Sequence, residues 1–216
     1  LSSIFVLPTP LISLYTRFLH STPQPTPSTL FPYSPLFRTT NRSRRSIALF
    51  EAAIKEGGKI GEEEMRRIKY DTGYEKAGYA KSWMDSIAAL DLKDAPELQK
   101  AQGLLAKWDW DLEGKSPADA LALMVLRPAN RTHYRRQAPP DPREVLQEKV
   151  DHLIKYFGRI DPPMGDVLRL RQGDVDLPLD GGNDTIRAST LWDIDDDGRL
   201  SVRHGDSFIQ FVEWDP

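Results

Sequence analysis

The sequence contains no cysteine, and its histidines are few. A chain without cysteine has no disulfide framework, no thiolate nucleophile and no Cys-ligated zinc. The four histidines show no His-x-x-x-His or related spacing of the kind that zinc hydrolases use; they are His20, His133, His152 and His204. We therefore expect neither a cysteine hydrolase nor a zinc hydrolase.

Acidic residues are missing from the first fifty positions, and Glu51 is the first of them. Residues 1–40 are rich in Ser, Thr and Pro, and five prolines between Pro23 and Pro35 predict an extended, unpacked segment. An acid-poor composition with Ser and Arg is typical of an organellar transit peptide. The chain also begins with Leu rather than Met, so the alternative is a non-native or out-of-frame leader. We interpret residues 1–40 as a disordered or non-native leader.

Long hydrophobic runs are missing too. The apolar stretch at residues 4–7 is followed by Pro8 and Pro10, which break the core of a secretory signal and leave it too short to span a membrane. The formal net charge of -3 and the pI of about 5.9 give no general attraction to nucleic acid. We expect no membrane span, no usable targeting signal and no nucleic-acid partner.

What the chain does contain is an ordinary globular composition: 216 residues, 39% of them hydrophobic and 28% charged. From about Ser43 to Gly158, apolar residues recur at helical spacing. Predicted helix starts lie at Asp94, at Ser116-Pro117 and at Asp141-Pro142, where a capping residue precedes the helix. Residues 127–140 are predicted to be a polar, Pro-containing connection.

After Gly158 the pattern changes to the alternation typical of strands. The predicted strands are residues 166–171, 185–192, 199–203 and 207–214, with turns at 173–176 and 181–182. The fold class is therefore α+β, with a helical first two-thirds followed by antiparallel strands. We expect a leader at residues 1–40, a helical region at 41–160 and a strand region at 161–216, the last two packing as one partial domain.

An acidic turn resembles the beginning of a calcium loop. Asp193, Asp195 and Asp197 occupy positions one, three and five of such a loop, and Gly198 occupies position six. Position twelve is His204 instead of the bidentate Glu, and strands rather than helices flank the turn. We interpret it as an Asp-Gly hairpin turn and keep a calcium site at the three aspartates as the alternative.

Two other clusters suggest chemistry at first sight. His204, Asp206 and Ser207 bring together the side-chain types of a catalytic triad, but near neighbours on a strand point in different directions, so a polar turn is the better interpretation. Asp109 and Asp111 alternate with two tryptophans, and we interpret this group as a helix-end cluster instead of a carboxylate pair or a sugar-stacking platform.

An ordered set of segments resembles the C-terminal part of the β chain of the penicillin acylase family, which includes the acyl-homoserine lactone acylases. The similar segments are residues 40–45, 70–72, 105–109, 164–167, 179–188 and 204–214. They follow the family order and span most of the chain from Asn41 to Asp215. The family's active-site asparagine precedes the Asn-Arg motif, and the nearest match here is residues 20–23, where either the asparagine is replaced by another residue or the similarity is accidental.

The resemblance implies a fragment of an N-terminal-nucleophile hydrolase with an αββα body, which cleaves the carbon-nitrogen bond of linear N-acyl amides such as an antibiotic or a quorum signal. The nucleophilic Ser of that family lies upstream, so we expect the chain to be inactive alone. The implied partners are the α chain, the N-terminal part of the β chain and a small N-acyl amide substrate. No cofactor is required, although calcium occurs in the family, and the implied location is periplasmic or secreted.

Arg42 is the single residue to which the resemblance assigns a role: the arginine of this motif lies near the active site and supports its geometry. The alternative for Arg42 is a helix-start arginine that binds local carbonyl groups. The alternative for the whole chain is a non-catalytic helix-plus-hairpin module that binds calcium or a protein partner.

Overall fold

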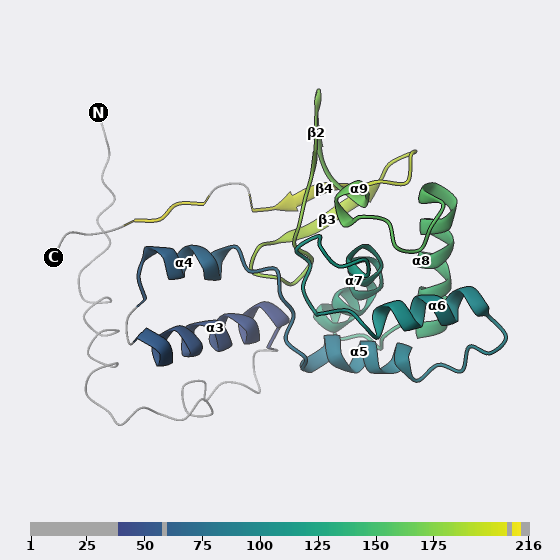
Figure 1. Cartoon of the computed structure of the whole chain (residues 1–216), viewed down its shortest axis with the longest axis horizontal. Coiled ribbons are helices and arrows are strands. Elements are labelled where there is room, and N and C mark those ends of the chain that lie inside the picture. Colours follow the sequence, from purple (N-terminus) through teal and green to yellow (C-terminus); the bar gives the residue numbers. More distant parts are fainter. Residues whose placement is uncertain (1–38, 58–59, 207–208, 213–216) are drawn as a thin grey trace. The chain divides into compact units, whose positions relative to one another are not determined.

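The computed structural model describes residues 39–57, 60–206 and 209–212 (Figure 1). Within these residues, seven helices precede a four-stranded sheet, so the predicted α+β class is confirmed. The helices and the sheet share one hydrophobic core, to which Trp83, Leu121 and Leu146 contribute from the helices and Trp192 and Leu200 from the strands.

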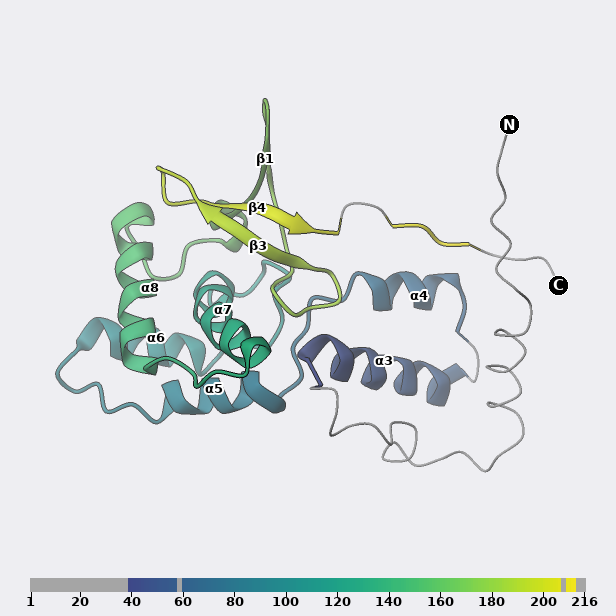
Figure 2. The ribbon, with the colours of Figure 1, turned by 180° about the vertical axis from the view of Figure 1, so that it is seen from behind.

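The first two helices, α3 (Asn41–Gly57) and α4 (Glu62–Lys69), lie side by side in both ribbon views (Figures 1 and 2). They pack through a small cluster of their own, made by Leu49, Ala53 and Ile68. Helices were expected here from the spacing of apolar residues, but the buried apolar side chains of α3 are Leu49 and Ala53, whereas Ile54 on α3 and Met65 on α4 are exposed. Because this cluster is small, the position of α3 depends strongly on the polar contacts of its first turn.

The remaining helices are α5 (Gly78–Ala88), α6 (Pro96–Leu105), α7 (Asp119–Arg135), α8 (Pro142–Phe157) and the short α9 (Met164–Val167). Helix α7 is central, because residues 120–126 are all buried, and it contacts α5, α6, α8 and α9. In the part of the chain that the structure describes, no helix is long and apolar enough to cross a membrane.

The predicted connection at residues 127–140 is wrong over most of its length, since α7 continues through Pro128 to Arg135. Proline removes one backbone donor from a helix interior. The carbonyl that loses its helical donor is that of Met124, four positions earlier, and the neighbouring carbonyl of Val125 accepts from the indole Nε1 of Trp83 at 2.8 Å. Burial of the whole first half of α7 outweighs the local preference of Pro128 for a break.

Capping was predicted with mixed success. Asp141 caps α8 by accepting from the amides of Arg143 and Glu144, and Gly158 ends the helix in the left-handed conformation, as expected. The predicted cap at Asp94 is wrong: α6 begins one residue later after Ala95, and the Asp94 carboxylate pairs with Arg143 at 2.5 Å. An exposed ion pair with α8 replaces the local cap.

The sheet contains β1 (Leu168–Gln172), β2 (Val175–Pro178), β3 (Ser189–Ile194) and β4 (Leu200–Gly205) in the order β2-β1-β4-β3. The pairs β1–β2 and β3–β4 are antiparallel, but β1 and β4 run parallel. The expectation of purely antiparallel strands is therefore wrong at this central pair. The long connection 179–188 joins the β1–β2 hairpin to the β3–β4 hairpin, and it places β4 beside β1 with both strands running in the same direction.

Several strand limits also differ from the prediction. Strand β2 was predicted as part of a turn, whereas the turn is only Gly173–Asp174 and the chain then pairs back on β1. Residues 185–188 lie in the connecting loop, and Asp166 and Val167 belong to α9. Of the predicted strand 207–214, residues 209–212 have no regular structure, and residues 207, 208, 213 and 214 lie outside the described residues.

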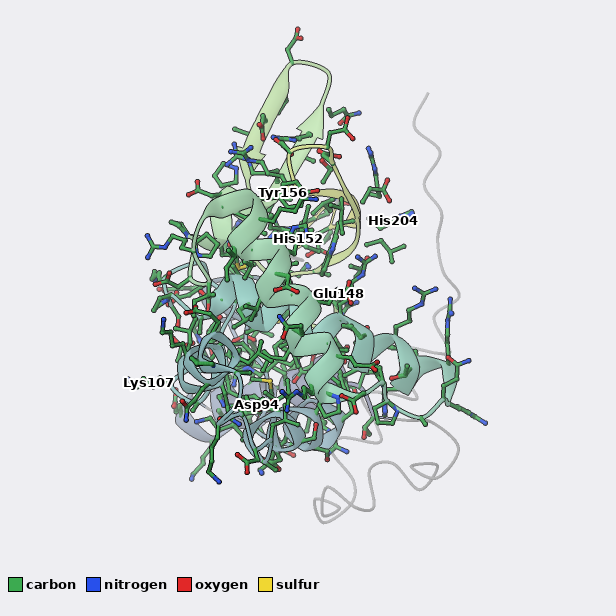
Figure 3. All side chains as sticks on the ribbon, turned by 90° about the vertical axis from the view of Figure 1, so that its right-hand side faces the viewer. Asp94, Lys107, Glu148, His152, Tyr156 and His204 are labelled. Carbon is green, nitrogen blue, oxygen red and sulfur yellow. The ribbon has the colours of Figure 1, made fainter. Side chains whose placement is uncertain are left out.

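Helix α8 packs on the turn between β3 and β4 through His152 and Tyr156, which lie one turn apart along the helix (Figure 3). His152 Nε2 is 2.8 Å from the carbonyl oxygen of Gly198, and a Cβ at that glycine would meet the Tyr156 ring at 2.1 Å. The glycine at the end of the acidic turn is thus required both by its positive φ of 80° and by this close approach.

Candidate functional site

The first turn of α3 contains the Asn-Arg motif and has no acidic residue of its own. The backbone amides of Asn41 and Arg42, which have no acceptor inside the helix, are instead bound by Asp184, which lies more than 140 positions later in the sequence. One carboxylate oxygen accepts from the Asn41 amide at 2.7 Å and the other from the Arg42 amide at 3.3 Å. Asp184 is 1% exposed, so this buried carboxylate acts as the cap of α3 and is favoured by the positive end of the helix dipole.

Asn41 holds three segments together from the same position. Its side-chain amide donates to the carbonyl of Asp184 at 2.8 Å and to that of Gly73 at 3.2 Å, and its side-chain oxygen accepts from the Glu75 amide at 2.8 Å. The side chain is buried, and every polar atom of its carboxamide is used. Asn41 thus fixes the beginning of α3 against the loop that precedes α5.

Two tyrosines complete the coordination of the Asp184 carboxylate. The Tyr79 hydroxyl donates at 3.1 Å and the Tyr134 hydroxyl at 3.3 Å, while Asn130 donates to the Tyr79 oxygen at 2.9 Å. Burial raises the pKa of both tyrosine hydroxyls, and the Asp184 charge raises them further. Both remain protonated donors at neutral pH, so these groups bind a charge and do not relay a proton. We call Asn41, Arg42, Tyr79, Tyr134 and Asp184 the Asp184 cluster.

Arg42 is exposed, as is Tyr134 in the same cluster. Its Nε donates to the carbonyl of Thr185 at 2.9 Å, which anchors the guanidinium to the loop after Asp184. The alternative for Arg42 was a contact with local carbonyls, and the acceptor is a carbonyl 143 positions away in the sequence. That contact uses one donor of a group that carries five, so it is compatible with a further role for the outer face of the guanidinium.

Other segments of the ordered resemblance meet beside the cluster. Arg45 pairs with Asp71 at 2.8 Å and with Glu75 at 3.0 Å. The backbone amide of Arg187 donates to the carbonyl of Asp71 at 2.9 Å, which joins the second segment to the loop 179–188. These contacts bring residues 40–45, 70–72 and 179–188 into one network.

The three aspartates predicted as a calcium alternative are bound by arginines. Arg203 contacts Asp193 at 2.7 Å, and Arg171 contacts Asp195 at 2.8 Å and Asp197 at 2.7 Å. The Arg171 guanidinium holds the pKa of Asp197 well below its usual range. Over residues 39–57, 60–206 and 209–212, no group of three or more His, Cys, Asp or Glu side chains is placed to hold a metal ion. The turn has the hairpin geometry that was its simpler interpretation.

The other sequence clusters do not converge. His204 is exposed on β4, whereas Asp206 faces Lys69 at 2.7 Å, and Ser207 lies outside the described residues. Asp109 and Asp111 lie in the loop after α6 instead of at its end, and the buried ring of Trp108 is stacked at 5.4 Å on Trp110. Neither group forms a catalytic constellation or an open stacking platform.

The Asp184 cluster was missed by the sequence prediction except for Arg42. One signal was present: α3 has no acidic residue in its first turn, and Thr40 Oγ1 caps only the Ser43 amide at 3.2 Å, so the Asn41 and Arg42 amides needed an acceptor from elsewhere. Nothing local identifies Asp184, Tyr79 and Tyr134 as the partners, because they come from a loop and two other helices.

A scan against protein-family models matches no family. The functional interpretation therefore depends on the residues and their geometry.

Proposed function

We propose that this chain is the closing portion of a penicillin-acylase-like amide hydrolase, and that it supplies scaffold and one supporting residue to an active site whose nucleophile lies upstream. The observation that carries the proposal is the Asp184 cluster. It joins the Asn-Arg motif to the loop 179–188, two segments that are far apart in sequence and were selected for resemblance alone.

In this proposal Arg42 is a positioning residue. Its exposed guanidinium is held by the Thr185 carbonyl, and its backbone amide is held by Asp184, so both its direction and the start of α3 are fixed. A guanidinium fork has donors left for carbonyl or carboxylate groups of an upstream segment. Arg42 would order that segment around the catalytic serine and would take no part in bond cleavage.

In the resembled family the nucleophilic serine lies upstream of the segments found here, and the polar groups of the Asp184 cluster are bound to one another. The chain alone is therefore expected not to hydrolyse N-acyl amides. Hydrolysis by the purified chain, reproducible after further purification, would contradict this expectation.

The test of the proposal is expression of the chain joined to its own upstream coding region, followed by assay with a panel of chromogenic N-acyl amides. The joined protein should hydrolyse at least one of them. Arg42→Ala should lower kcat/KM by on the order of a hundredfold, because small displacements of catalytic groups have effects of that size, and Arg42→Lys should restore only part of it. Lys55→Ala, at the exposed far end of α3, is the matched control and should change nothing.

A further inference from the structure

The two central strands of the sheet are paired over only part of their length. Strands β1 and β4 are neighbours at Leu168↔Leu200 and Arg169↔Ser201, but β1 continues to Gln172 and β4 to Gly205. Beyond those two positions, no described strand pairs with β1 on its β4 side or with β4 on its β1 side. The β1–β2 hairpin rises away from β3 and β4 in both ribbon views (Figures 1 and 2).

A cavity of about 420 Å³ lies where the strands separate. We call it the strand cleft, and it is lined among others by Leu170, Leu179, Arg187, Val202, Gly205 and Asp206. Its lining combines apolar side chains with charged ones, which come from both strands and from the loops beside them. Residues of β1 and of β4 thus line the cleft from two sides.

Strand backbone without a partner is a template for another strand. Gln172 pairs with Val175 across the two-residue turn, so the next residue along β1, Arg171, directs its backbone N–H and C=O away from β2 and toward the cleft. Opposite it, β4 offers the stretch from Val202 to Gly205. A single extended segment placed between them would complete both ladders.

The charges of the lining indicate what kind of segment fits. Arg171, Arg187 and Arg203 line the cleft against one carboxylate, that of Asp206. Arg171 and Arg203 already have carboxylates at 2.7 Å, but Arg187 is 3.5 Å from Asp180 and 3.6 Å from Asp206. The guanidinium of Arg187 is therefore the loosely held cation of the cleft.

We propose that the strand cleft accepts an extended, acidic segment of a second polypeptide, which adds a strand between β1 and β4 and places a carboxylate on Arg187. Backbone hydrogen bonds would supply the affinity, and the Arg187 contact and the apolar walls would select the sequence. This inference goes beyond the proposed function and does not depend on it.

The probe is a blocked six-residue peptide of alternating valine and glutamate, labelled with a fluorophore and titrated with the full chain. We expect saturable binding, with slowed amide hydrogen exchange at Arg171 and in the part of β4 that follows Val202. The same peptide with alternate backbone amides methylated should bind more than tenfold more weakly, because it cannot complete the ladder. Arg187→Ala should weaken binding about tenfold, Arg187→Lys should retain most of it, and Arg159→Ala, an exposed arginine paired with Asp161 outside the cleft lining, should leave it unchanged.

Three results would overturn the proposal. Absence of binding at millimolar peptide would show that the cleft does not accept a strand. Equal affinity of the methylated and unmethylated peptides would show that binding does not use backbone hydrogen bonds to β1 and β4. Displacement of the peptide by hexanoate at the same concentration as by unlabelled peptide would show a small-anion pocket instead. Thermal midpoints of the Arg187 variants, measured alongside, must match that of the parent chain for the comparison to count.

Discussion

Removal of the Asp184 carboxylate is expected to destabilise the beginning of α3 and the loops bound to it. Asp184→Ala leaves the Asn41 and Arg42 amides without their acceptor and takes the common partner from two tyrosine hydroxyls. Loss of a helix cap costs ~1 kcal/mol. Loss of a hydrogen bond to a buried charge costs ~2 kcal/mol, and only the Tyr79 contact at 3.1 Å is counted in full because the Tyr134 contact is longer.

The expected decrease in the free energy of unfolding is therefore ~3 kcal/mol. In urea this corresponds to a decrease of the midpoint by roughly 1–3 M, since small domains have m-values of about 1–3 kcal/mol/M. Asp184→Asn should lose less, ~1–2 kcal/mol, because one oxygen can still accept while the new amide faces a donor. Asp174→Ala, at the exposed tip of the β1–β2 hairpin, is the control and should stay within about 0.5 kcal/mol of the parent.

The location of the effect is also predicted. Hydrogen exchange should accelerate first in the opening turn of α3, because the small cluster beneath it contains few buried side chains. A decrease below about 1 kcal/mol, or unchanged exchange in α3 with the loss spread over the sheet, would refute the role assigned to Asp184.

Further outcomes follow from single residues. Burial raises the pKa of Asp119 to about 6 from an ordinary 3.8, so between these pH values the folded state binds more protons than the unfolded state. The urea midpoint of the parent should therefore fall, relative to that of Asp119→Asn, as the pH rises from 4 to 7. A parent midpoint that rises relative to the variant over this range would contradict the prediction. Gly181→Ala should destabilise the fold by ~2–4 kcal/mol, because φ is +77° and the new Cβ would lie 2.2 Å from the Arg187 carbonyl oxygen. Gly103→Ala, in open space on α6, should stabilise it by ~0.5–1 kcal/mol. Equal changes in the thermal midpoints of the two variants would contradict this reasoning. Calcium should leave the thermal midpoint of the parent unchanged. In Arg171→Ala, which removes the ion-pair partner of Asp195 and Asp197, calcium should raise the midpoint. A calcium-dependent rise in the parent alone would favour the calcium site over the plain hairpin turn.

The fold class and most helices were predictable because their signals are local. Apolar spacing identified α3 and α8, and the Asp141 cap and the Gly158 stop lie next to the residues they act on. The prediction failed where the structure of a segment depends on packing against residues that are distant in the sequence. Pro128 favours a break, but the buried first half of α7 carries the helix past it.

The sheet and the candidate site show the same division. The Gly173–Asp174 turn was recognised but placed too long: Val175, Asp176 and Leu177 alternate in polarity, but β2 has only four residues, all exposed, and the pattern is too short to identify a strand. The parallel pairing of β1 with β4 depends on the path of the connection 179–188, which no local pattern describes. Asp184 could be read only as part of a turn, because its partners at Asn41 and Tyr79 become neighbours through tertiary packing.

The claim that this chain closes an amide hydrolase is tested most directly by sequencing the transcript upstream of the codon for Leu1 and translating it in all frames. The account predicts a reading frame that joins the chain at about Asn41 and encodes an upstream segment led by a serine at a processing site. A continuous frame that reaches Asn41 without such a serine-led segment would contradict the account.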